Sequence, residues 1–181
     1  LGVLNKEIPI KAHAHRADDI LTAIRIAKEF DLKLTIEHCT EGHLIADILR
    51  DEGVSAIVGP YLTDRSKIEL RNLSIKTPGI LAKAGVKVAI MTDHPCMPIQ
   101  YLSLAAAMAV REGMDEAEAM KAITINAAEL TGIDDRVGSI EPGKDADIVI
   151  FDGHPFELKT RVVNTIINGK VVYERNKNER D

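Results

Sequence analysis

A short apolar run that stops abruptly at polar residues constrains the fold of this chain more than any other feature. The run from Val86 to Met91 follows Gly85 and ends at Thr92, Asp93 and His94. Such a run is typical of a strand buried in a parallel sheet. Because α/β folds carry their chemistry beyond the carboxyl ends of these strands, we expect Asp93 to lie at a functional site.

Two earlier strand-like runs end in the same way. Ile8 to Ala12 leads into His13 and His15, and Leu34 to Glu37 leads into His38. The carboxyl ends of parallel strands lie at one edge of a sheet, so these side chains should converge with Asp93. Neutral imidazole and carboxylate are ligands that zinc, iron and manganese accept. The three strand ends therefore predict a divalent metal site.

Strand and helix patterns alternate through the first part of the chain. Apolar residues recur at helical spacing from Ile20 to Phe30, and further strands are expected at 33–37, 56–58 and 86–91. Alternation of this kind predicts a parallel sheet covered by helices. Polar residues at several strand ends favour an eight-stranded barrel over an open doubly wound sheet, because the barrel draws its catalytic groups from many strands.

The pattern changes after Pro98. Helices are expected between about 99 and 130, and from 137 onward a period of two predicts strands at 146–151, 162–167 and 170–173. The Asn168-Gly169 pair is a strong hairpin signal. We therefore expect a partial barrel domain in residues 1–134 and a small antiparallel β-segment in residues 135–181, with a frayed charged tail from Glu174 to Asp181.

Composition narrows the class of protein. The chain has 181 residues and a net charge of −5, and its basic residues occur only as scattered pairs. This balance argues against nucleic-acid binding. Membrane spans need roughly 20 apolar residues, and no segment approaches that length. The first residues lack signal-peptide architecture, so we expect a cytoplasmic location, where Cys39 and Cys96 would not form a disulfide framework.

Several stretches spread over most of the chain carry a resemblance to a known family. They are IKAHAHRADDI, TIEHCTEGH, IMTDHP, AMAVREGMDEAEAMKAITINAAELTGI, and the highly specific VGSIEPGKDADIVIFDGHP with IINGKVVY. Together they resemble the amidohydrolase superfamily, closest to its imidazolonepropionase-like branch. The resemblance implies a metal-dependent hydrolase on a (β/α)8 barrel, of which this chain supplies strands 5–8. It also implies a small β-sandwich assembled from both chain ends.

The resemblance assigns residues to the predicted site. It implies that His13 binds metal after the fifth strand, that His38 does so after the sixth, and that Asp93 is the metal-adjacent acid after the eighth. Members of the superfamily also carry a His-X-His pair after the first strand, and often a carboxylated lysine or a glutamate after the fourth. Neither region occurs in this chain, which therefore resembles one half of an enzyme of roughly twice the length.

The predicted chemistry is hydrolysis of a C–N bond in a small-molecule amide or cyclic amide. A divalent ion, with zinc preferred over iron or manganese, lowers the pKa of bound water toward about 7 and polarises a carbonyl group. Asp93 would accept the proton from that water and pass it to the leaving nitrogen. Without the missing ligands the isolated fragment should be inactive.

Four further residues are predicted to bind substrate or support the site. His15 lies two residues beyond His13 on an extended segment and therefore points to the same side. Tyr61 and Arg65 belong to the long polar segment 61–76, which is expected to be a functional loop. His94 either contacts substrate or supports the neighbouring Asp93.

Two alternatives remain open. The chain could be a non-catalytic metal-binding or interaction module that retains the half-barrel. A doubly wound nucleotide-binding domain is disfavoured, because no glycine-rich loop follows a predicted strand. The open edges of a four-stranded parallel sheet, left by the missing strands, predict that the isolated chain associates into a homo-oligomer.

Overall fold

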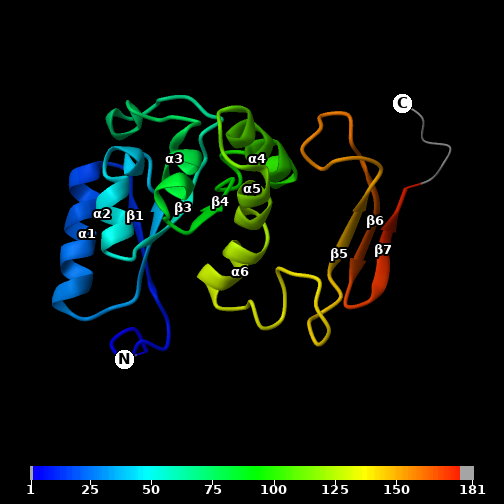
Figure 1. The fold of residues 1–181 in the computed structure, drawn as a ribbon, viewed down its shortest axis with the longest axis horizontal. Coiled ribbons are helices and arrows are strands. Elements are labelled where there is room, and N and C mark those ends of the chain that lie inside the picture. Colours follow the sequence, from blue (N-terminus) through cyan, green and yellow to red (C-terminus); the bar gives the residue numbers. More distant parts are fainter. Residues whose placement is uncertain (1, 176–181) are drawn as a thin grey trace.

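A computed structural model describes residues 2–175 and shows two separate β-sheets with helices packed around the first (Figure 1). The first sheet has four strands and the second has three. The tail from Glu174 to Asp181 was predicted to fray, which is wrong for its first two residues: Glu174 ends the last strand, and Arg175 pairs with Asp152. The rest of that prediction, residues 176–181, lies outside the described residues.

The first sheet is entirely parallel, as predicted. Its strands are β1 (Ile10–Ala14), β2 (Leu34–His38), β3 (Ser55–Val58) and β4 (Val88–Ile90). They lie side by side in chain order. A doubly wound sheet reverses its strand order at a switch point, and this sheet has no such reversal among its described strands. The register places Ala14 opposite His38 and His38 opposite Val58, so the carboxyl ends of β1, β2 and β3 are level.

The structure shortens the predicted strand 86–91 at its start. Gly85 adopts a left-handed conformation at the end of the preceding helix, and the N–H of Val86 donates to the carbonyl of Leu81. Val86 therefore belongs to the helix terminus rather than to β4. Met91 still bonds to the carbonyl of Val58, so the pairing of β4 with β3 extends to the site.

Helices cover the parallel sheet (Figure 1). Helix α1 buries Ile20, Ile24 and Ala27 as one apolar stripe, as its spacing predicts. Further along, Asp115 caps α5 by accepting from the N–H of Glu118. The helical elements are α1 (Ala17–Glu29), η1 (Gly42–Leu44), α2 (Ala46–Asp51), η2 (Ile68–Leu70), α3 (Thr77–Ala84), η3 (Ile99–Tyr101), α4 (Leu102–Arg111), α5 (Glu116–Ala122) and α6 (Ile125–Thr131). Within residues 2–175, none of these helices combines the length and apolar character needed to cross a bilayer.

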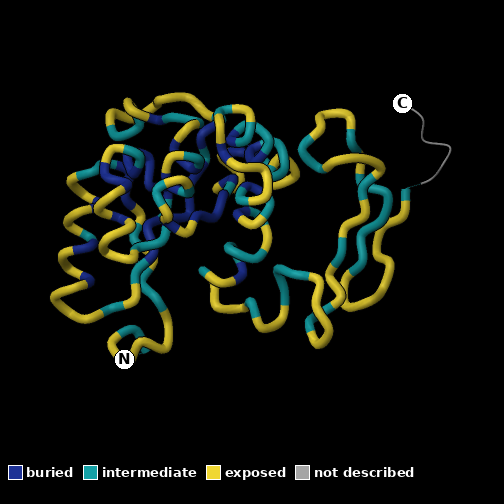
Figure 2. Tube along the Cα trace, in the orientation of Figure 1, coloured by how far each residue is buried: buried dark blue, intermediate teal, exposed yellow. Residues whose placement is uncertain are grey.

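The main core lies around the parallel sheet. Figure 2 shows the buried backbone concentrated there, whereas the C-terminal sheet is partly buried or exposed. Ile36, Leu49, Leu81 and Val88 are almost completely buried. The alanines of α4 bring that helix close to its neighbours, because their side chains need little space.

The second sheet is antiparallel and consists of β5 (Ile148–Phe151), β6 (Val162–Ile167) and β7 (Lys170–Glu174). Asn168 and Gly169 both have positive φ, which the predicted two-residue hairpin turn requires. All five residues of β7 are exposed.

Candidate metal centre

The ends of β1 and β2 bring three histidines together. His13 lies in β1, His15 follows that strand directly, and His38 is the last residue of β2. The chain then turns sharply, because His38 and Cys39 both have positive φ. Such values are uncommon for residues other than glycine, and they cluster at functional sites.

The three imidazole rings face one another. The Nε2 atoms of His13 and His15 are 3.1 Å apart. The ring centroid of His38 lies 4.1 Å from that of His13 and 4.5 Å from that of His15. One ring nitrogen from each residue falls within 4.8 Å of the other two. Zinc binds imidazole nitrogen at about 2.0–2.1 Å, and three ring nitrogens gathered in this way could hold one ion.

Two of the rings are oriented through their other nitrogen. Nδ1 of His38 donates to the carbonyl of Gly59 at 2.7 Å, and Nδ1 of His15 lies 2.8 Å from the hydroxyl of Thr40. These contacts leave both Nε2 atoms directed toward the cluster. Metal-binding histidines usually hold their second nitrogen in this way. The donor set and its orientation therefore fit a divalent metal.

Burial keeps two of the imidazoles neutral. It lowers the pKa of His15 to about 4, and the nearby His38 acts in the same direction. Burial also lowers the pKa of His38, against the influence of the Gly59 carbonyl. Neutral imidazole is the form that binds a metal ion, so no proton must first be removed at neutral pH.

Asp93 lies beside this cluster but is not one of its three clustered ligand groups. It follows β4, is exposed and has positive φ. Its charge acts to raise the pKa of His38. The roles predicted for Asp93 in metal binding and proton transfer stay predictions.

The other predicted site residues are more scattered. Tyr61 is buried, and its hydroxyl donates to the carbonyl of Ala105 at 2.7 Å. Arg65 donates to the carbonyl of Leu73 at 2.9 Å. Both line a hollow of about 650 Å³ whose lining includes none of the three histidines. His94 is exposed next to Asp93. Substrate contact by these residues stays a prediction.

Sequence reasoning missed Thr40, Gly59 and Glu69. Thr40 and Gly59 orient the imidazoles, and Oε1 of Glu69 lies 3.6 Å from Nε2 of His15. Of these three residues, only Gly59 could have been noticed in the sequence, because the Gly59-Pro60 pair ends a predicted strand. The other two contacts join segments that are distant along the chain.

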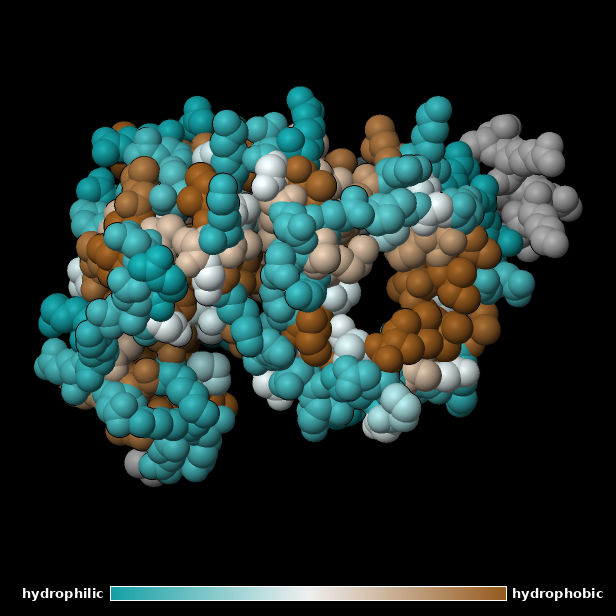
Figure 3. All heavy atoms as spheres, in the orientation of Figure 1, coloured by the Kyte–Doolittle hydropathy of each residue, from teal (hydrophilic) through white to brown (hydrophobic). Residues whose placement is uncertain are grey.

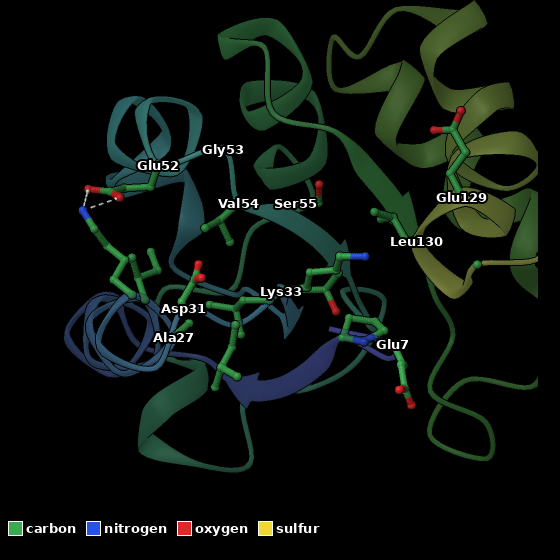
Figure 4. A pocket seen from close by; sticks show the side chains of 17 residues that line it. Glu7, Ala27, Asp31, Lys33, Glu52, Gly53, Val54, Ser55, Glu129 and Leu130 are labelled. Atoms are coloured by element: carbon green, nitrogen blue, oxygen red, sulfur yellow. Dashed lines mark hydrogen bonds and ion pairs between the residues drawn. The ribbon is translucent and has the colours of Figure 1, made fainter. Parts of the chain in front are cut away.

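A second hollow, of about 530 Å³, lies at the opposite ends of the strands (Figure 4). Its lining includes Lys33, Val54 and Ser55 at the starts of β2 and β3. Glu52 in this hollow pairs with Lys28. The hollow contains none of the clustered histidines, so the candidate chemistry lies at the other edge of the sheet.

A parallel α/β sheet with a cluster of imidazoles at its carboxyl edge defines a class of protein suited to metal binding. Residues 6–172 match the Amidohydrolase family, and the chain belongs to that family. The predicted family is thereby confirmed.

Individual relatives agree with this assignment. The crystal structure of an amidohydrolase from Thermotoga maritima MSB8 is 49% identical, with a TM-score of 0.93, and the match covers 96% of this chain and 45% of that one. The imidazolonepropionase of Geobacillus kaustophilus is 51% identical over 75 residues, which are 40% of this chain and 18% of the relative. The N-substituted formamide deformylase of Arthrobacter pascens is 27% identical over 190 residues, and the match covers 87% of this chain and 34% of the relative. The chain thus spans less than half the length of each of these relatives.

Proposed function

We propose that this chain carries part of the active site of a metal-dependent hydrolase that cleaves C–N bonds of amides or cyclic amides. The observation that carries the proposal is the cluster of His13, His15 and His38, with two rings oriented by Thr40 and Gly59. Family membership supports hydrolysis, and the name of the formamide deformylase supports an amide substrate.

The residues have distinct roles in this proposal. His13 and His38 bind the ion, and His15 either completes the ligand set or contacts substrate. When bound, a divalent ion such as zinc supplies Lewis acidity, which polarises a carbonyl group and acidifies water. Asp93 accepts a proton from the attacking water and delivers it to the leaving nitrogen. Asp93 is exposed beyond the carboxyl end of β4, which leaves the carboxylate accessible for this role.

We also propose that the parallel sheet is an arc of a (β/α)8 barrel. Four strands in unbroken chain order support this arrangement, as does the use of three different strand ends for the site. The two ends of such an arc would then adjoin further strands, and the remaining ligands would come from those strands.

Metal titration of the 181-residue chain tests the proposal. We expect weak binding of one Zn²⁺ or Co²⁺ ion per chain, because three imidazoles form an incomplete set. His38→Ala should abolish this binding, whereas His154→Ala should not, since His154 lies in a distal turn. Binding that is absent, or that is unchanged in His38→Ala, would contradict the metal centre. Bound metal without hydrolysis in a full-length context would favour a non-catalytic module instead.

A further inference from the structure

Glu41 is a buried carboxylate whose two oxygens bind two different segments. The residue is 6% exposed. Its Oε2 accepts from the backbone N–H of Ala17 at 2.9 Å, and its Oε1 accepts from Nδ2 of Asn72 at 2.8 Å. Buried carboxylates are retained only when they are hydrogen-bonded or paired. The two contacts therefore account for the presence of this charge in the interior.

Both of these contacts lead to the histidine cluster. Ala17 is the first residue of α1, two positions after His15, and the N–H of Glu41 donates to the carbonyl of His15 at 2.8 Å. Asn72 belongs to the segment 61–76, which also carries Glu69. The carboxylate of Glu69 lies 3.6 Å from Nε2 of His15. Glu41 thus joins the end of β1 to the segment that covers it.

The interior of the segment 61–76 has few other polar attachments. The hydroxyl of Tyr61 holds one end to α4, and Thr77 just beyond the other end lies 2.9 Å from Nδ1 of His43. Arg65 bonds only within the segment, to the carbonyl of Leu73. In the described part of the chain, the bond from Asn72 to Glu41 is the one side-chain hydrogen bond that ties residues 62–76 to another element.

We propose that Glu41 is a positioning residue that holds the segment 61–76 over the metal centre and keeps Glu69 beside His15. Glu69 then presents a carboxylate at the edge of the centre, where it accepts an N–H or a cationic group of the substrate. This role in recognition rests on the proposed function. The positioning itself rests only on the contacts of Glu41.

Amide hydrogen exchange in the 181-residue chain tests the positioning without any metal. Asn72→Leu removes the hydrogen bond between Glu41 and the segment 61–76. The hydrogen bond from Ala17 of α1 to Glu41 remains. Loss of a hydrogen bond to a charged group corresponds to roughly a tenfold or larger change in an equilibrium. We therefore expect about tenfold faster exchange in residues 62–76 and unchanged exchange in α1. Arg71→Ala, a neighbouring exposed substitution, is the matched control and should change neither.

Two variants of Glu41 separate positioning from general stability. Glu41→Ala should increase exchange in both the segment and the start of α1. Glu41→Gln should restore protection, because its amide can accept from Ala17 and donate to the side-chain oxygen of Asn72. Unchanged exchange of residues 62–76 in Asn72→Leu would overturn the proposal. So would a Glu41→Gln chain that folds but behaves like Glu41→Ala.

The visible spectrum of bound Co²⁺ tests the link to the centre. Asn72→Leu and Glu69→Gln should perturb the spectrum in the same way, and the double variant should match either single variant. If the spectral change of the double variant equalled the sum of the two single changes, Asn72 would not act on the centre through Glu69, and this link would be overturned. If Co²⁺ does not bind at all, the proposed function fails, whereas the exchange measurements still decide the role of Glu41.

Discussion

Among the individual residues, His15 has the clearest effect on how the free energy of unfolding changes with pH. Burial lowers its pKa to about 4, whereas an unfolded histidine titrates near 6.5. Between these values the unfolded chain binds more protons than the folded one, so the free energy of unfolding decreases as the pH falls. This contribution is fully present above about pH 6.5.

We expect the metal-free chain to lose about 2 kcal/mol of unfolding free energy from His15 between pH 7 and pH 5. Urea unfolding in the presence of a chelator measures this loss. The variant His15→Gln should show a smaller decrease over the same range, with the remainder coming in part from His38, whose pKa is also lowered. Equal pH dependence in the two proteins would contradict the neutral buried imidazole.

The role of Asp93 leads to a second prediction. In a full-length context, Asp93→Asn should reduce turnover roughly a hundred- to ten-thousand-fold, because an amide cannot transfer the proton. The fold and most metal binding should remain, since Asp93 is exposed and stands outside the imidazole cluster. Steady-state kinetics and elemental analysis measure the two effects. Near wild-type turnover with bound metal would disprove the proton-transfer role.

The sequence predicted some of these residues and not others for a physical reason. His13, His38 and Asp93 mark the points where apolar strands end, which is a local pattern that the chain itself displays. Thr40, Glu41 and Glu69 act through contacts between segments that are 24 to 54 residues apart. No local periodicity encodes such contacts, so only the fold reveals them.

Among the elements, β3 supplies orientation rather than a ligand. Gly59 directly follows its last residue, Val58, and the carbonyl of Gly59 accepts from Nδ1 of His38. A Cβ atom at Gly59 would lie 2.0 Å from the carbonyl oxygen of Met91, and its φ of 143° is one that side chains rarely adopt. The close approach of β3 and β4 therefore requires glycine here.

Gly59→Ala should displace the end of β3 and release His38. We expect a loss of about 1–3 kcal/mol in unfolding free energy, as for other strained backbone positions. Metal affinity should fall roughly 10–100-fold, as it does when the partner of a metal-binding histidine is lost. Calorimetric titration measures both affinity and stoichiometry. Gly53→Ala is the control, because Gly53 also has positive φ but nothing lies within 4 Å of its Cβ position. Equal metal affinities in the two variants would contradict the role of the Gly59 carbonyl.

Element type and order were predictable, whereas element boundaries were less so. The alternation of strands and helices correctly indicated the parallel sheet, and Asn168-Gly169 correctly indicated the hairpin. The start of β4 was displaced because the left-handed Gly85 draws Val86 back to Leu81. This difference arises from hydrogen bonds at a helix end, which the apolar pattern does not specify.

At the scale of the whole molecule, the two sheets leave different surfaces exposed. Apolar side chains gather over the C-terminal sheet in Figure 3. Val171 and Val172 are 59% and 58% exposed, and Tyr173 is 46% exposed. In the parallel sheet, β1 and β4 form the edges. The side chain of Asn126 donates to the carbonyl of Val88 and so covers part of the β4 edge. The edge of β7 is therefore the more available of these surfaces.

We expect the 181-residue chain to associate in solution through these surfaces. Unpaired strand edges bearing apolar side chains recruit other chains, and identical chains usually associate with two-fold symmetry. Val171→Lys combined with Tyr173→Lys places charge on β7 and should shift the chain toward the monomer by at least tenfold in dissociation constant. Thr22→Lys, an exposed change on α1, is the control and should leave association unchanged. Light scattering at tens of micromolar measures the mass of each protein. A wild-type chain that remains monomeric and unfolds cooperatively would show that the exposed edges do not drive association. Dimers unaffected by the β7 changes would place the contact at the parallel sheet instead.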